Sequence, residues 1–250
     1  MPSSPTHPLD TLRAAIPPVT DGVEGVVAQT GVISGTAFFP GGWGLWGTQE
    51  GQDLPAMPTG GIMIVGQDFD SEHGFEVSKS RRSELEVRTD GTYRSPTWRE
   101  LVKLLTDVGI DLKQCFFTNA YMGLRAGAKN TGRFPGATHK PYRESCRAFF
   151  IKQVAAMQPR LIIALGNWVP AFIAPLAAAL DSWKTARTFT DIDRAGSLRK
   201  GVVFSPEIPD CSVIALTHPS FRQLNVHRRS YAGHNGKPAE EQLLRDALQR

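Results

Sequence analysis

Four short, continuous apolar runs constrain the fold of this chain more than any other feature of its sequence. Every position in them is apolar, whereas a strand with one face in water alternates apolar and polar residues. Continuous runs of this length are typical of strands in a parallel sheet that is covered on both faces. The four runs are Ile62–Val65, Cys115–Phe117, Leu161–Leu165 and Val213–Leu216.

Segments with apolar residues at helical spacing lie between and after these runs. In one of them, Leu101, Leu104 and Leu105 recur on one helical face. Strands that alternate with helices indicate an α/β fold with right-handed crossovers. We therefore predict an α/β three-layer sandwich, with a central four-stranded parallel sheet flanked by helices. The predicted helices are Trp98–Val108, Tyr142–Met157, Ala171–Trp183 and Ala239–Gln249.

The 250 residues are enough for one large domain with a sizeable core. The sequence contains no internal repeat and no low-complexity linker. We therefore predict a single domain over residues 1–250, with residues 1–60 as an N-terminal extension packed on it. The segment Val77–Arg94 receives no role from the sequence.

Composition excludes several classes of protein. A hydrophobic share of 41% is too high for a disordered chain. No run of about 18 apolar residues could span a membrane, and the first twelve residues lack the apolar centre of a secretory signal. The three cysteines form no C-x-x-C pair, which is typical of reduced thiols in a cytoplasm. We therefore expect a cytoplasmic monomer with no membrane partner.

The distribution of charge is more informative than the net charge of +4. The segment from Arg125 to Arg147 contains six Lys and Arg side chains, these two included, against one acid, Glu144. A second basic cluster (Arg222, Arg228 and Arg229) follows His218. Such clusters fit contacts with phosphate groups, although a solvated surface is the simpler interpretation.

Polar residues follow the predicted strands at the point where each strand ends. Asp68 follows the first run, Asn119 the second and His218 the fourth. Ligands of open parallel sheets bind at the carboxyl ends of the strands. We therefore expect a carboxylate, an amide and an imidazole to meet at one edge of the sheet.

These three groups suit the hydrolysis of an N-glycosidic bond. Cleavage of this bond develops positive charge on the sugar and negative charge on the departing base. A carboxylate such as Asp68 can stabilise the sugar and align a water molecule. An imidazole such as His218 can donate to the anionic oxygen of the base, and the amide of Asn119 can read the edge of a flipped pyrimidine.

The same residues lie in motifs that resemble the uracil-DNA glycosylase superfamily. Gly66–Asp68 is similar to the start of the family-one motif G-Q-D-P-Y-H, and His218–Ser220 is similar to its H-P-S motif. Phe117–Asn119 resembles the strand end whose Asn binds uracil. Glu144–Cys146 and Gln158–Gly166 are closer to families four and five. The motifs stand in the family's order between Gly61 and Arg229.

The resemblance implies a monofunctional glycosylase that removes uracil from DNA, with uracil-containing DNA as its partner. It implies that Asp68 and His218 are catalytic and that Asn119 binds uracil, and we add Gln67, Phe69 and Phe75 to the substrate-binding residues. The DNA-binding candidates are Ser220, Phe221, Arg222, Leu224, His139 and Lys140.

The sequence also departs from the family. Phe69 and Asp70 stand where family one has Pro and a Tyr that excludes thymine. Cys146 matches one ligand of the iron–sulfur cluster of families four and five, but three cysteines cannot form a four-cysteine cluster. We therefore expect no cofactor and no metal.

Simpler structural interpretations remain open for several of these residues. Asp68 and Asp70 could cap a turn or helix, as Asp residues after strands often do. Phe75 could be a core residue instead of a surface on which a flipped base stacks. His139 could be an exposed loop residue, although its neighbourhood resembles the loop of a DNA-trapping branch of the superfamily.

Two other functions also remain open. One is a DNA-binding protein of the same fold that recognises uracil or abasic sites and holds them with little turnover. The other is a nucleoside or nucleotide hydrolase that does not act on DNA, which the sheet alone would permit. The two basic clusters count against the second of these.

Overall fold

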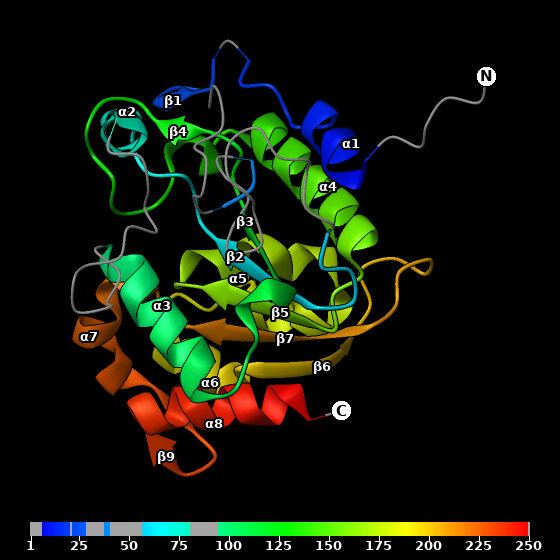
Figure 1. Ribbon diagram of the computed structural model, residues 1–250, viewed down its shortest axis with the longest axis vertical. Helices are drawn as coiled ribbons and strands as arrows, with labels where there is room; N and C mark the ends of the chain where they lie inside the picture. Colours follow the sequence, from blue (N-terminus) through cyan, green and yellow to red (C-terminus); the bar gives the residue numbers. More distant parts are fainter. Residues whose placement is uncertain (1–6, 21, 29–37, 41–56, 81–94, 250) are drawn as a thin grey trace.

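The computed structural model describes residues 7–20, 22–28, 38–40, 57–80 and 95–249. Its centre is a five-stranded sheet with helices on both faces, so the predicted three-layer α/β sandwich is confirmed (Figure 1). The strands are, in order across the sheet, β3 (Cys115–Asn119), β2 (Ile62–Gly66), β5 (Leu161–Leu165), β7 (Cys211–Leu216) and β6 (Leu198–Val202).

The four predicted strands are parallel, and the fifth strand was not predicted. Strand β6 lies at the edge of the sheet and runs antiparallel to β7. Of its five residues only Val202 is buried, and its centre reads Arg-Lys-Gly. An edge strand with one side in water needs no continuous apolar run, so its sequence does not carry the pattern that identifies the other four strands.

The register of the parallel strands brings their carboxyl ends to one edge. Gly66 at the end of β2 pairs with Asn119 at the end of β3, and Leu165 of β5 pairs with Leu216 of β7. Every residue of β2, β3 and β5 is buried. A register shift would expose these apolar side chains, so burial fixes the positions of the loops that follow.

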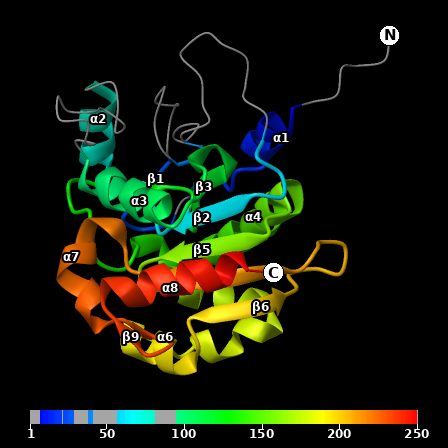
Figure 2. The ribbon, with the colours of Figure 1, turned by 60° about the horizontal axis from the view of Figure 1, so that its bottom comes forward.

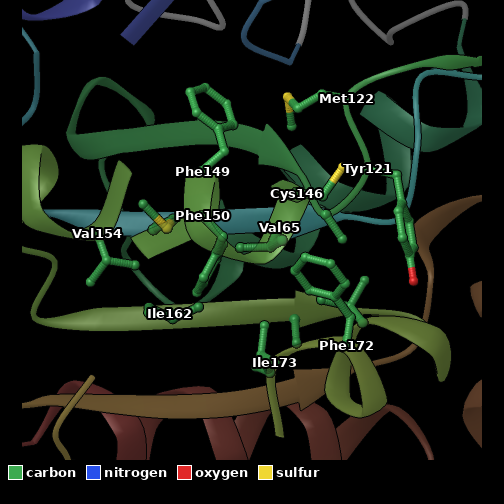
Figure 3. Packing of buried hydrophobic residues seen from close by; sticks show 14 of the residues in the cluster. Val65, Tyr121, Met122, Cys146, Phe149, Phe150, Val154, Ile162, Phe172 and Ile173 are labelled. Carbon is green, nitrogen blue, oxygen red and sulfur yellow. The ribbon is translucent and has the colours of Figure 1, made fainter. Parts of the chain in front are cut away.

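Successive residues of each strand pack into two separate cores, one on each face of the sheet. Ile62 and Ile64 contribute to a core with α3 (Pro96–Asp107) and α8 (Lys237–Leu248). Figure 2 shows α8 lying across this face. Met63 and Val65 point to the opposite core, which contains α4 (Lys140–Met157). Figure 3 shows side chains of α4 gathered around Val65.

Three of the four predicted helices are present as α3, α4 and α8, but the prediction of one helix over Ala171–Trp183 is wrong. Helix α5 (Trp168–Ile173) ends at Ile173, and two 3₁₀ segments, 174–176 and 178–183, follow it. Pro175 has no backbone N–H and its ring clashes with a helical carbonyl, and Ala177 is extended with φ of −151°.

The remaining elements are short and connect the layers. Of the segment Val77–Arg94, residues 77–80 form the end of α2, and residues 81–94 lie outside the described part of the chain. In the described part, no helix combines the length and the apolar character needed to cross a membrane. The short elements are α1 (Pro8–Ala14), β1 (Val26–Val27), α2 (Glu72–Ser80), β4 (Leu124–Arg125), α6 (Phe189–Ala195), α7 (Arg222–Asn225), β8 (Ser230–Tyr231) and β9 (His234–Asn235).

Candidate active site

The carboxyl ends of the strands bring Asp68, Asn119 and His218 to one edge, as the sequence predicted. A Cβ atom on Gly66 would lie 2.2 Å from Oδ1 of Asn119, so only glycine allows these two strand ends to approach so closely. Gly166, at the end of β5, has φ of +80° and lies beside the Cβ of His218. The negative charge of Asp68 acts on His218 and favours its protonation.

The carboxylate of Asp68 lies in a buried ion pair with Arg125. Nη2 of Arg125 is 2.7 Å from Oδ2, and Nε is 3.2 Å from Oδ1. Two more groups donate to the same carboxylate: the side-chain amide of Gln67 to Oδ2 at 2.8 Å, and the N–H of Asp70 to Oδ1 at 3.1 Å. The exposed fraction of the Asp68 side chain is 8%.

Sequence reasoning missed the role of Arg125, which it had counted as the first residue of a basic surface segment. The side chain is 5% exposed. Besides Asp68, its guanidinium binds the carbonyl oxygens of Thr131, Gly132 and Arg133 at 2.7–3.2 Å. No local pattern could have indicated this contact, since 57 residues separate the two partners.

His218 presents one ring nitrogen to the site. Its Nδ1 accepts a hydrogen bond from the N–H of Ser220 at 3.3 Å. In a neutral imidazole the proton then lies on Nε2, which becomes a donor. Burial lowers the pKa of His218 below its ordinary value, and the nearby charge of Asp68 offsets only part of this shift. A neutral histidine with its proton on Nε2 is therefore the resting form, and Nε2 donates to no residue in the described part of the chain.

Asn119 ends β3 with a side chain available to a ligand. It is 3% exposed, and its amide makes no hydrogen bond to any described residue. The preceding residue fixes the strand end, because Oγ1 of Thr118 donates to Oε1 of Gln153 on α4 at 2.5 Å. The amide of Asn119 offers one acceptor oxygen and one donor nitrogen at the end of the strand.

A comparison with known protein families identifies the family of this chain. Residues 57–247 match the family model described as the uracil DNA glycosylase superfamily. The chain belongs to the uracil-DNA glycosylase superfamily. None of the curated proteins matched the chain. Membership confirms the resemblance predicted from the motifs and assigns the chain to the DNA-binding glycosylases of DNA repair.

Two aromatic side chains that the sequence placed in the uracil pocket are buried in the core next to α4. Phe69 is 9% exposed and Phe75, on α2, is 6% exposed. For Phe75 this placement agrees with the alternative interpretation, in which it is a core residue and not a surface on which a flipped base stacks. The side-chain amide nitrogen of Gln67 is also occupied, because Nε2 donates to both Asp68 and the carbonyl oxygen of Gly132.

The loop after His218 presents apolar side chains to solvent, at the positions predicted to meet DNA. Phe221 is 42% exposed and Leu224 is 70% exposed. Ser220 is exposed, and its Oγ lies 2.5 Å from Oγ1 of Thr97 at the start of α3. This contact ties the loop to a helix of the main body.

Arg222 does not lie where a DNA contact would place it. Its side chain is 7% exposed, and Nε donates to Oε2 of Glu240 at 2.9 Å. Glu240, which sequence reasoning did not single out, is fully buried on α8. It also accepts from the N–H of Thr217 and from Arg229. Glu240 therefore fixes the loop at its start, its middle and its end.

His139 and Lys140 start α4. Nδ1 of His139 accepts from the N–H of Tyr142 at 3.3 Å, so His139 caps the helix. Its side chain is half-buried, and Lys140 is exposed. The cap accounts for His139 without a covalent role toward DNA, and exposed Lys140 keeps a position open to phosphate.

The cysteines do not fit the iron–sulfur cluster of superfamily members in families four and five. Cys115 and Cys211 begin β3 and β7, at the edge of the sheet opposite the candidate site, whereas Cys146 lies in α4. Burial raises the pKa of Cys146 to about 11 and that of the other two thiols to about 12. Cys115 packs in the core on one face of the sheet and the other two cysteines pack in the core on the opposite face, so the three thiols cannot ligate one cluster.

Proposed function

We propose that the chain is a monofunctional glycosylase that hydrolyses the N-glycosidic bond of uracil in DNA and leaves an abasic site. The observation that carries the proposal is the state of His218. A neutral imidazole whose Nδ1 is occupied presents Nε2–H at the same edge as Asn119 and Asp68. This is the arrangement that stabilises an anionic base as it departs.

Each group has a separate task in the proposed reaction. The Asn119 amide donates to O4 of uracil and accepts from N3–H. His218 donates from Nε2 to O2, where negative charge develops as the glycosidic bond breaks. Asp68 faces the developing positive charge of the sugar and orients the water that attacks its C1′. The water oxygen bonds to C1′ as the C1′–N1 bond breaks, a proton passes from the water to the carboxylate of Asp68, and the base leaves as an anion with the bonding electron pair.

One observation favours a second candidate function, the recognition of uracil or abasic sites with little turnover. The four donors around Asp68 leave its oxygens without a free position for water. A carboxylate locked in this way would support binding but not hydrolysis.

A single assay separates the two functions. The protein is incubated with an oligonucleotide that contains one uracil, and abasic sites are then cleaved with alkali. Samples are run on denaturing gels with and without heating. Strand breaks support the glycosylase, and a shifted band that survives heating supports a covalent trap. Binding in a native gel without breaks supports recognition alone.

Asn119→Asp is expected to change the base preference from uracil to cytosine. Cytosine presents an acceptor at N3 and a donor at N4, the reverse of uracil, and carboxylate oxygens accept from the N4 amino group. We expect uracil excision to fall by about 10²-fold or more and cytosine excision to appear, because unpaired buried polar groups discriminate strongly. Excision is measured on matched uracil and cytosine oligonucleotides. Unchanged excision of uracil by the variant would exclude direct reading by Asn119.

Leu224→Ala is expected to lower excision from duplex DNA by about tenfold, equivalent to about 1.4 kcal/mol. An apolar wedge that fills the gap left by a flipped base offsets the cost of unstacking, and single strands lack that cost. Because Leu224 is 70% exposed, thermal stability should not change. Val203→Ala is the matched control. Val203 is 50% exposed and follows β6, at the end of the strands opposite the candidate site. Equal losses on single and double strands would remove the wedge role.

A further inference from the structure

The carboxylate of Asp68 has its full complement of hydrogen bonds. A carboxylate offers about four acceptor positions, and four donors occupy them: Nε and Nη2 of Arg125, the N–H of Asp70, and Nε2 of Gln67. A water molecule can bind to this carboxylate only if one donor leaves. Which donor leaves then determines how Asp68 can work.

The guanidinium of Arg125 is equally saturated, so it is not the donor that leaves. All five of its N–H groups are used, two on Asp68 and three on the carbonyls of Thr131, Gly132 and Arg133. The backbone N–H of Arg125 also binds the carbonyl of Asp70. Breaking the pair would leave a cation and an anion unpaired in a site that is almost fully buried.

The contact from Gln67 is the one that opens at least cost. Gln67 is half-buried, and it donates both of its N–H groups, to Asp68 and to the carbonyl of Gly132. Its Oε1 is buried without a hydrogen-bond partner in the described part of the chain. Rotation of this side chain would free one acceptor position on Oδ2 of Asp68 and would let Oε1 reach a donor.

We propose that Arg125 is a positioning residue for the glycosylase reaction. It holds Asp68 in one orientation and joins the loop after β2 to the backbone of residues 131–133, while the water takes the place of Gln67 on Oδ2. Arg125 touches neither the base nor the sugar and acts through Asp68. The inference rests on the proposed function, since it needs Asp68 to act on water.

A double-mutant cycle tests this role by measuring the single-turnover rate of uracil excision for Arg125→Gln, Asp68→Asn and the double variant. A misplaced carboxylate is expected to cost Arg125→Gln about 10²-fold in rate. In the Asp68→Asn background the same substitution should change the rate by less than about threefold, because coupled partners are not additive. Arg125→Lys, which keeps the charge, should recover part of the rate.

A purely structural role for Arg125 would give a different result. Loosening of residues 131–133 would raise KM for DNA, and the losses in rate would multiply in the double variant. Either finding would overturn the proposal. The matched control is Arg160→Gln, an exposed arginine before β5 at the opposite edge, which should leave the rate unchanged.

Two further measurements keep the test decisive. Thermal melting shows whether Arg125→Gln folds, and if it does not, Arg125→Lys must still lose rate without a rise in KM. If the wild-type protein excises no uracil, the proposed function fails. Non-additive melting temperatures in the same cycle would then show the ion pair to be structural only, and the positioning role would fall with the function.

Discussion

Asp68→Asn is expected to lower the single-turnover rate of uracil excision by about 10²–10⁴-fold, the largest effect of any single substitution at the site. In the wild-type protein, the carboxylate of Asp68 faces the positive charge that develops on the sugar and orients the attacking water. The variant loses both the attraction and the group that orients the water. At an effective dielectric constant near 20, two charges about 4 Å apart interact by roughly 4 kcal/mol. At 1.36 kcal/mol for each tenfold change in rate, this corresponds to about 10³-fold.

The same substitution should also destabilise the protein. Removing one partner of a buried ion pair costs about 3–5 kcal/mol, because the remaining charge stays buried. The asparagine would also turn an N–H toward donors that now face an oxygen, either Gln67 or Arg125. The double variant Asp68→Asn/Arg125→Gln removes the unpaired charge. It should therefore recover much of the melting temperature and remain inactive, which separates loss of catalysis from loss of folding.

Asp70→Asn is the comparison that tests the assignment. The carboxylate of Asp70 accepts from the N–H of Ser71 at 2.6 Å and lies over Gly74, where a Cβ would be 2.4 Å from Oδ2. Asp70 thus belongs to the turn before α2 and supports Ser71, whose Oγ caps the helix by accepting from the N–H of Gly74 at 3.0 Å, so its loss should affect stability more than rate. If Asp68→Asn excises uracil at nearly the wild-type rate and Asp70→Asn does not, the two roles are reversed.

The parallel part of the fold could be predicted because it depends on local patterns. Apolar runs buried on both faces identify β2, β3, β5 and β7, and the order of strand ends places Asp68, Asn119 and His218 at one edge. Strand β6 could not be found in this way, because its position at the edge lets water reach most of its residues.

The ion pairs could not be predicted, because they join residues that are distant in the sequence. Arg125 and Arg222 were both interpreted as surface charges that meet phosphate, which is the usual state of arginine. Each is buried, because Asp68 balances one and Glu240 the other. Periodicity reports which face of an element is apolar. It does not report which charge on another element will compensate a buried one.

The burial of Arg222 changes the surface that we propose for DNA binding. Of the residues predicted to meet DNA in the loop after His218, Ser220, Phe221 and Leu224 are exposed, and Arg222 instead supports the loop from below. The loop therefore presents apolar side chains on a base fixed by Glu240. A rigid base suits a wedge, since a mobile loop would lose conformational entropy each time it entered the duplex.

His218→Ala is expected to lower the single-turnover rate by about 10²–10³-fold, as for the loss of one donor to a developing oxyanion. Affinity for DNA with a non-cleavable uracil analogue should change little, because a neutral uracil oxygen needs the donor less than an anionic one does. His234→Ala, which removes an exposed imidazole from β9, is the matched control and should retain the wild-type rate.

The pH dependence of stability gives a second measure of His218. Burial lowers its pKa in the folded protein, so the unfolded chain binds the proton more readily. The folded state is therefore penalised as the pH falls below the ordinary imidazole pKa of about 6.5. His218→Ala removes this penalty, and its melting temperature should fall less than that of the wild type between pH 7 and 5.

The kinetic measurements on His218→Ala have two contrary outcomes. A variant that loses affinity in proportion to rate would mean that His218 only positions the DNA. A variant with neither defect would leave Thr217–Ser220 as a strand end without a role in the departure of the base.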